Sequence, residues 1–474
     1  MKKIFIKIST VIFIFAFLTA CEDDFVNEPA PTDQVGENVI FGSRTGADAY
    51  ISGIMRRFRT QFDATDSAGL NSIYYARTVK GNDLIQRNTW FTYDYENDNR
   101  EPTYRRVRFT WNYSYHMIGQ TNILITGVEN SPALSDQDKK ELIGQAKAIR
   151  ALFYFQLAQE FQHTYSYDKT LPAPPIVTSI TTEGGPMSTL EEMYTLILDD
   201  LTYAVANLND TRLGKSYINK AVANGILSRV YLTMENWAGA QTAANAAYGG
   251  GTPFLDASTY GNGFDDYTNP EWIWGSAQSS DQSNYYWGAP HAQADHYTLS
   301  YSATYVNNDF VNLFSATDVR ALFTEKLDVP DEDYRNWVTT KFTFNFDSDH
   351  PIIRTAEMLL TEAEAMARQS FDVPAAALLF SLQSNRDINA VASGNTGADL
   401  ISEIMVERRK ELYAEIGVEW FDAKRTRSGI TRTGNQRIMS VADLSADDKK
   451  FFLKIPQIEI DANDNIDDSI NADR

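Results

Sequence analysis

Residues 219–247 read NKAVANGILSRVYLTMENWAGAQTAANAA, and this stretch decides the fold class. Its first half repeats apolar side chains at helical spacing, at Ala223, Ile226, Leu227, Val230 and Tyr231. Glu235 and Asn236 then form a polar break, and small residues follow it. The pattern predicts two antiparallel helices, over 219–234 and from Trp237 on, joined by a tight turn in which small residues face large ones.

A second pair of helices is predicted over 353–369 and 374–390. Apolar spacing also predicts helices over 45–62, 105–129, 136–163, 188–208 and 398–416. Ser135 and Ser188 are suitable N-cap residues for two of them. Divergent pairs of this kind are tetratricopeptide-like, so the expected fold class is mostly α.

Two long stretches lack helical spacing, residues 63–104 and 249–350, and both are rich in Asn and aromatic residues. Short extended pieces are predicted at 171–176, where prolines exclude a helix, and at 271–275. Loops on a rigid scaffold are the usual place for binding. We therefore expect one domain over 41–474, with a helical scaffold over 41–248 and 351–474 that carries the two irregular insertions.

The N-terminus has the pattern of an export signal. Three lysines lie within residues 1–7, an apolar run follows, and small residues precede Cys21. The run is shorter than the about 20 apolar residues that span a bilayer. We expect residues 1–20 to be a signal peptide and residues 21–40, with Pro29 and Pro31, to be an extended tether.

Cys21 is the only cysteine in 474 residues, so no disulfide can form within the chain. A lone cysteine directly after Leu18-Thr19-Ala20 is similar to the lipobox of bacterial lipoproteins, in which the thiol is lipidated. The alternative is an unmodified thiol beside an ordinary cleavage site. A diacyl group on Cys21 would anchor the protein stably in the outer membrane. In many Gram-negative lipoproteins of this kind, acidic residues such as Glu22-Asp23-Asp24 accompany placement on the outer face.

The formal net charge is −21, and the expected signal peptide contributes only positive charge. A balance this acidic argues against nucleic acid as a partner and against binding to anionic lipid surfaces. It suits a domain that a tether holds away from a membrane.

Several motifs, in this order along the chain, resemble the SusD/RagB family. A helix that carries Ala146, Arg150, Ala151, Tyr154, Phe155 and Leu157 is similar to the family's "E-A-x-x-x-R-A-x-x-Y-F-x-L" segment. Later segments are similar to the proline stretch, the helix pairs and the C-terminal blocks of the family: Pro172–Pro175, Asn219–Ala240, Arg354–Ala367, Glu407–Leu412, Trp420–Asp422 and Lys454–Glu459. The resemblance covers nearly the whole chain after Cys21. The sequence departs from the family at Glu415–Gly417, which Ile416 interrupts, and at Glu419, where a basic residue is usual.

This resemblance implies a SusD-like α-α superhelix with four tetratricopeptide-like pairs. It implies a partner as well, a SusC-like TonB-dependent outer-membrane transporter over which the protein acts as a lid. The implied ligands are oligosaccharides or polysaccharides, and peptides in some members. No catalysis, cofactor or metal is expected.

The residues of the expected binding site lie in the two irregular regions. Sugar rings pack their C–H faces on aromatic rings, and their hydroxyls need Asn, Asp, Gln or Arg in the ring plane. The first cluster offers Trp90 and Tyr93 for stacking, with Arg87 and Asn88 as polar partners. The second offers Tyr286 and Trp287, with Asn284 as the polar partner. Each aromatic residue could instead fill a small core within its loop. We read Trp111, Trp237 and Trp420 as core, and expect at most one of Trp272 and Trp274 to face a ligand.

An enzyme and a pure scaffold are the alternative functions. A glycoside hydrolase needs two carboxylates across a cleft, but 63 acidic residues make such pairs inevitable, and no known catalytic motif is present. His291, His296 and Asp295 could suggest a metal site, and 461–468 a calcium loop; the latter lacks the required glycine and final glutamate and reads as a solvated tail. A scaffold that binds only the transporter would not need two aromatic-rich insertions.

Overall fold

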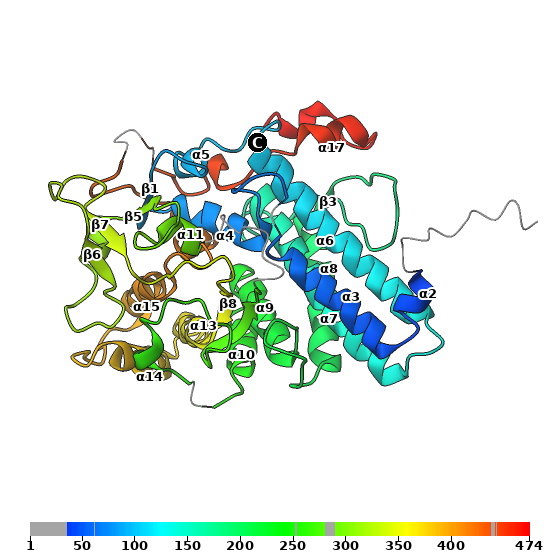
Figure 1. Cartoon of the computed structure of the whole chain (residues 1–474), viewed down its shortest axis with the longest axis horizontal. Helices are drawn as coiled ribbons and strands as arrows, with labels where there is room; N and C mark the ends of the chain where they lie inside the picture. The colour runs from blue at the N-terminus through cyan, green and yellow to red at the C-terminus, as the bar shows by residue number, and fades with distance from the viewer. Residues whose placement is uncertain (1–35, 61, 252–253, 280–289, 438–440, 442) are drawn as a thin grey trace, which may run out of the picture.

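The structure, a computed structural model, describes residues 36–474 apart from 61, 252–253, 280–289, 438–440 and 442 (Figure 1). Helices dominate, as the sequence predicts. The N-terminal half contains α2 (Glu37–Ile40), α3 (Arg44–Arg57), α4 (Gly69–Val79), α5 (Thr92–Tyr95), α6 (Arg105–Asn130), α7 (Asp136–Phe161) and α8 (Leu190–Asn207). The C-terminal half contains α11 (Pro290–Ala294), α12 (Asn308–Val311), α15 (Gly397–Leu412), α16 (Val418–Thr426), α17 (Gln457–Ala462) and the helix pairs described next.

The two predicted helix pairs are confirmed. The first consists of α9 (Lys220–Thr233) and α10 (Trp237–Ala247), and the second of α13 (Thr355–Arg368) and α14 (Asp372–Arg386). Asn219 and Asn236 cap the first two helices through their side-chain oxygens. Helix α10 packs on both α9 and α13, so the pairs stack on each other (Figure 1).

Helices α6, α7 and α8 form the other end of the scaffold, and α3 lies along α6 (Figure 1). Ser135 caps α7, as predicted. The cap of α8 is Thr189 rather than Ser188, because Thr189 and Glu192 exchange hydrogen bonds as a capping box. Ser188 instead lies in a two-residue strand that pairs with the proline stretch.

The strands are short and connect segments far apart in the chain. β1 (Leu84–Gln86), β5 (Thr304–Val306), β7 (Trp337–Thr339) and β6 (Phe323–Glu325) form one sheet in that order. Two strand pairs complete the set: β2 (Pro172–Ala173) with β3 (Ser188–Thr189), and β4 (Trp272–Ser276) with β8 (His350–Arg354). All pairings are antiparallel. The extended segments predicted at 171–176 and 271–275 thus contain β2 and all but the last residue of β4.

The region 63–104 is more regular than the sequence predicts. Helix α4 lies inside it, and every residue of this helix is buried. A helix buried on all sides has no solvent-facing polar stripe, so local amphipathic spacing does not predict it. The region 249–350 is largely irregular, as expected, with the short helix η2 (Ala257–Thr259) and the strands β4 to β7.

Helix α15 is tied to β8, to α14 and to the second insertion by a buried ionic network. Glu411 accepts hydrogen bonds from Arg354 at 3.0 Å, from Arg386 at 3.0 Å and from Arg320 at 3.2 Å. Burial alone would raise the pKa of Glu411, but the three guanidinium groups hold it well below its usual value. The family-like motif at 407–412 is therefore structural.

The C-terminal segment is not the solvated tail that the sequence predicts. Helices α17, η3 (Lys449–Phe451) and η4 (Asp468–Asn471) are ordered parts of the fold. Ile466 is buried, and the Arg474 side chain donates to the carbonyl of Pro172 at 2.7 Å. The acidic side chains of 461–468 are exposed. The charge pattern therefore predicts the exposure of these side chains, but it does not predict that the segment packs on the scaffold.

Candidate functional site: an exposed aromatic loop

The first predicted cluster runs from the end of β1 into the start of α5, and we call residues 87–93 the aromatic loop. Internal hydrogen bonds define its shape. The Gln86 amide donates to Thr89 Oγ1 at 2.8 Å, and the Thr89 N–H donates to Thr92 Oγ1 at 2.7 Å. The start of the loop pairs with the second insertion, because the Arg87 N–H donates to the carbonyl of Ala303 at 2.9 Å.

Both aromatic side chains predicted to stack on a ligand are at the surface. Trp90 is 39% exposed and Tyr93 is 59% exposed. The guanidinium carbon of Arg105 lies 5.6 Å from the centroid of the Trp90 ring, and Arg105 donates two 2.9 Å hydrogen bonds to Asp66. Trp90 is thus supported from beside the loop by a side chain that is itself fixed, which suits a preformed stacking surface.

The two predicted polar partners differ in their surroundings. Asn88 is exposed, and its Oδ1 accepts from Thr92 Oγ1 at 3.2 Å, so its amide nitrogen is turned away from that bond. Arg87 is half-buried, and its Nε has no hydrogen-bond partner among the described residues. Both side chains therefore retain donors for a ligand.

The second predicted cluster, with Asn284, Tyr286 and Trp287, lies outside the described residues. The chain that follows it, from α11 on, lies against the base of the aromatic loop. The Gln86 amide donates to Gln293 Oε1 at 3.3 Å. The hydroxyls of Thr65 and Tyr301 lie 3.1 Å apart. Segments some 200 positions apart thus meet at this surface.

One exposed aromatic residue of this segment was missed by sequence reasoning. Tyr297 is 57% exposed, with Lys326 Nζ 4.1 Å from its ring centroid. Tyr305, eight residues on, is buried against the rings of His296 and Tyr334. Nothing in the local sequence separates these two tyrosines, because the strand pairing of β5 decides which of them is covered.

The two histidines whose spacing could suggest a metal site have other partners. His291 Nε2 lies 2.6 Å from the carbonyl of Phe264, and His296 Nε2 lies 2.8 Å from that of Thr304. Burial lowers the pKa of both imidazoles, that of His291 to about 4. Asp295 accepts backbone N–H groups from Tyr297 and Phe344. No group of three His, Cys, Asp or Glu side chains in the described part of the chain could hold a metal ion.

The remaining tryptophans lie mostly in the interior. Trp111 and Trp420 are buried, as predicted, and Trp237 is half-buried under Arg368. Trp272 and Trp274 are both buried, because β4 is covered on both faces and its register shifts at this point. Trp90 is therefore the one large exposed indole of the described residues.

Glu419, which departs from the family pattern, has a definite structural role. Its Oε2 accepts the backbone N–H groups of Asn82 at 2.6 Å and Asp83 at 3.1 Å, just before β1. A basic side chain could not accept these bonds. Burial, together with the nearby Asp83 carboxylate, raises the pKa of Glu419 to about 7.

Comparison with known proteins agrees with this architecture. Residues 47–232 match a family model described as starch-binding and associating with the outer membrane, and residues 335–470 match the model of the SusD family. This chain belongs to the SusD/RagB family.

A SusD-like protein of Bacteroides ovatus is 24% identical over 241 residues. This match covers 50% of the chain but only 40% of the relative's length.

Solved structures share the whole fold. A SusD-like carbohydrate-binding protein of Bacteroides vulgatus superposes with a TM-score of 0.82 at 24% identity, over 90% of this chain and 97% of that one. A SusD superfamily protein of Bacteroides thetaiotaomicron gives 0.80 at 25% identity, over 90% and 99%. A laminarin-binding SusD-like protein gives 0.68 at 18% identity, over 89% and 97%. None of the helices in the described part of the chain has the length and apolarity to cross a membrane.

Proposed function

We propose that the protein is a cell-surface lipoprotein that captures an oligosaccharide or polysaccharide and delivers it to a SusC-like TonB-dependent transporter, without chemistry of its own. Capture is assigned to Trp90, Tyr93, Arg87 and Asn88 of the aromatic loop. The second face of the site is assigned to Asn284, Tyr286 and Trp287.

The observation that carries the proposal is the exposure of Trp90 on a hydrogen-bonded loop with Arg105 beside it. Burying an exposed indole against the C–H face of a sugar removes apolar surface from water. A fixed loop loses little conformational entropy when it binds. The family membership and the laminarin-binding neighbour support a glycan as the ligand.

Residues 41–474 form the binding unit in this proposal, behind a signal peptide over 1–20 and a tether over 21–40. Short helix α2 begins within that tether, at Glu37. Lipidation at Cys21 would hold the unit beside its transporter in the outer membrane. Co-localisation raises the effective concentration of a captured ligand at the transporter, so weak intrinsic binding is sufficient.

The test is isothermal calorimetry of the protein purified without residues 1–21, against a panel of soluble polysaccharides and peptides. Parent, Trp90→Ala and Trp287→Ala proteins are compared with Tyr167→Ala, which removes an aromatic residue of similar exposure that stacks on His163 elsewhere. We expect one glycan class to bind the parent and the control, and to bind the two tryptophan variants at least about 10-fold more weakly.

If only peptides bound, the ligand of the protein would be a peptide and not a glycan. If all variants bound the glycan equally well, the aromatic loop would not be part of the binding site. Co-purification with a TonB-dependent transporter, with and without glycan, separates a capture protein from a lid that binds only the transporter.

A further inference from the structure

A groove lies between α3 and the middle of α6, away from the aromatic loop. Its volume is about 430 Å³, and α3 contributes Ala49, Tyr50, Arg56 and Arg57 to its lining. Helix α6 contributes Gln120, whose Oε1 accepts a 2.8 Å hydrogen bond from the Tyr50 hydroxyl. The groove is therefore a feature of the helical scaffold and not of the two insertions.

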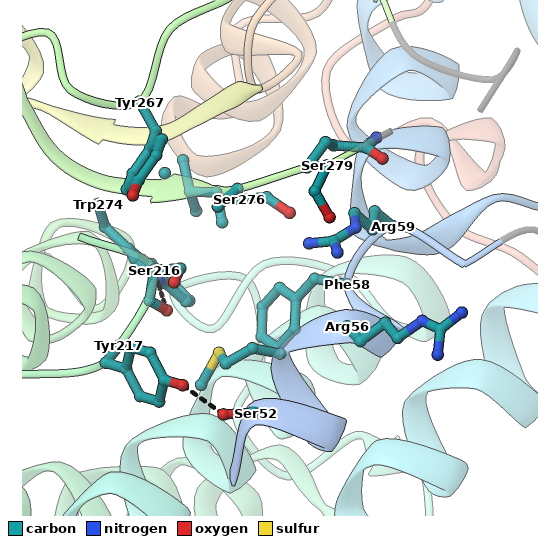
Figure 2. Close-up of a pocket in the computed structure, with 15 residues that line it drawn as sticks. Ser52, Arg56, Phe58, Arg59, Ser216, Tyr217, Tyr267, Trp274, Ser276 and Ser279 are labelled. Atoms are coloured by element: carbon teal, nitrogen blue, oxygen red, sulfur yellow. Dashed lines mark hydrogen bonds between the residues drawn. The ribbon is translucent and has the colours of Figure 1, made fainter. Parts of the chain in front are cut away.

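Two arginines at the C-terminal end of α3 have no counter-ion. Arg56 and Arg57 are exposed, and neither side chain makes an ion pair or a hydrogen bond with another described residue. Figure 2 shows Arg56 extending away from the neighbouring cavity, whereas the buried Arg59 is turned inward. The last turn of a helix favours cations through the helix dipole, but the dipole supplies no carboxylate. In a chain with a net charge of −21, this unpaired cationic pair suits an acidic segment.

The described chain begins beside this groove. Burial and the carboxylate of Glu37, the first residue of α2, together raise the pKa of the Tyr50 hydroxyl to about 12. The Tyr50 ring also packs on Phe41, which directly follows α2, with ring centroids 5.5 Å apart. The segment that precedes Gly36 therefore joins the described fold near the part of the groove that Tyr50 lines.

That segment is complementary to the groove in charge. Residues 22–35 contain five acidic residues and no Lys, Arg or His. Pro29 and Pro31 fix φ near about −65° and favour extended backbone. A segment that is already extended loses less conformational entropy when it docks.

The spacing along the two segments also matches. Arg56 and Arg57 follow Tyr50 by six and seven residues, which is about 9–11 Å along a helix. An extended chain covers that distance in three or four residues, at about 3.3 Å each. Counted back from Gly36, the acidic residue at this distance is Asp33.

We propose that residues 28–35 dock in this groove, with the Asp33 carboxylate between the guanidinium groups of Arg56 and Arg57. Docking shortens the free chain between Cys21 and the folded domain from about 50 Å to about 23 Å when extended. With a lipid on Cys21, the α3 side of the domain then lies close to the membrane. This consequence rests on the anchoring proposed above, whereas the docking itself does not.

The experiment is electron paramagnetic resonance of a nitroxide label in the protein purified without residues 1–21. That protein contains no cysteine, so Ala30→Cys introduces a single attachment point. At low salt we expect the motion of the label to be restricted. At about 1 M salt, where the Debye length is about 3 Å, the label should become mobile. A label that is already mobile at low salt overturns the proposal.

Charge reversal in the folded domain locates the contact. Arg56→Glu/Arg57→Glu should lower the ratio of restricted to mobile label about 5-fold or more. The matched control is Lys449→Glu/Lys450→Glu, which changes the net charge equally at η3, outside the groove. It should leave the label restricted. Equal effects of the two double variants, or no effect of the arginine variant, overturn the proposal.

Charge reversal in the tether keeps the test independent of folding. Asp33→Lys lies outside the folded domain and should also release the label. Combined with Arg56→Glu/Arg57→Glu, it should restore the restriction, because the charges of the two partners are exchanged. Failure of the combined variant to recover overturns the pairing of Asp33 with this arginine pair.

Glycan binding separates this proposal from the proposed function. The Asp33→Lys protein should bind the glycan like the parent, and Trp90→Ala should leave the label at position 30 restricted. Failure of one proposal therefore leaves the other standing.

Discussion

Arg105 links the aromatic loop to the start of the first insertion: its guanidinium carbon lies 5.6 Å from the Trp90 ring centroid, and it donates two 2.9 Å hydrogen bonds to Asp66. Asp66 is buried, whereas the Arg105 side chain is 41% exposed. Orientation of the exposed indole thus depends on a buried carboxylate that does not touch it.

Removal of Arg105 should therefore act on both stability and binding. Arg105→Gln leaves the Asp66 carboxylate buried without its partner, which should lower the free energy of unfolding by about 1–3 kcal/mol. The double variant Arg105→Gln/Asp66→Asn should recover most of that loss. Urea unfolding of the two single variants and the double variant measures the coupling, and additive effects would contradict the linkage.

The family-like arginine of α7 should be a main determinant of stability. Arg150 donates to both carboxylate oxygens of Asp200, at 2.7 and 2.8 Å, and both side chains are buried. Asp200→Ala should destabilise the protein by about 3–5 kcal/mol, because it leaves a buried unpaired guanidinium. The more exposed Arg44–Asp138 pair is the control, and Asp138→Ala should cost about 1 kcal/mol or less in chemical unfolding. Similar losses for the two variants would contradict the role of burial.

Gly417 should tolerate no side chain. Its φ is +70°, and a Cβ there would lie 2.3 Å from the Cβ of Arg77 on helix α4. Gly417→Ala should destabilise the protein by about 2–4 kcal/mol through left-handed strain and overlap.

Gly53 in α3 has open space around its would-be Cβ and provides the matched control. Gly53→Ala should stabilise by about 0.5–1 kcal/mol, because alanine is the better helix former. Thermal unfolding of both variants tests the pair. If Gly417→Ala left the stability unchanged, the junction between α15 and α16 would be able to relax and accept the side chain.

Asp349 should make stability depend on pH. Burial raises the pKa of its carboxyl to about 6, Asp266 adds to the shift, and backbone hydrogen bonds and Arg59 oppose it. The folded state then binds the proton more tightly than the unfolded state, where the pKa of this carboxyl lies near its ordinary value of 3.8. The stabilisation that protonated Asp349 contributes is fully present below the pKa of the unfolded state. It is lost as pH rises from about 4 to about 6.

Asp349→Asn cannot titrate, so its stability relative to the parent should increase between about pH 4 and pH 6 and stay level above that. Guanidinium unfolding of both proteins at a series of pH values gives the difference directly. A difference that does not change with pH would mean that the pKa is not raised.

Cys21→Ser should release the protein from the membrane. The serine hydroxyl cannot accept the thioether-linked lipid, and no described helix could serve as an alternative anchor. Fractionation of cells after labelling with a fatty-acid analogue should find the parent labelled in the membrane and the variant unlabelled. A labelled, membrane-bound variant would place the anchor elsewhere.

Much of the scaffold follows from sequence alone. The two helix pairs, the long helices α6 and α7, and the cap at Ser135 appear where local apolar spacing and capping chemistry predict them. These features depend on residues within about four positions of one another, so a linear pattern contains them. The family motifs were also readable, and the family assignment is confirmed.

Which residues are exposed at the candidate site is decided by contacts between segments far apart in the chain. The sequence points to Trp90 and Tyr93, and both are exposed, but it does not point to Tyr297. It left one of Trp272 and Trp274 as a candidate, and both are buried. It also missed α4, which is buried on every side. A tryptophan has the same local signature whether a distant strand covers it or not.

By itself, then, the sequence determined the helical repeat, the family and the lone cysteine after an apolar run. Tertiary structure alone decided which aromatic rings reach the surface and that the acidic C-terminal segment packs against the scaffold. The physical reason is that burial is set by the pairing of remote segments, such as β1 with β5 and β4 with β8, and such pairing leaves no trace in local spacing.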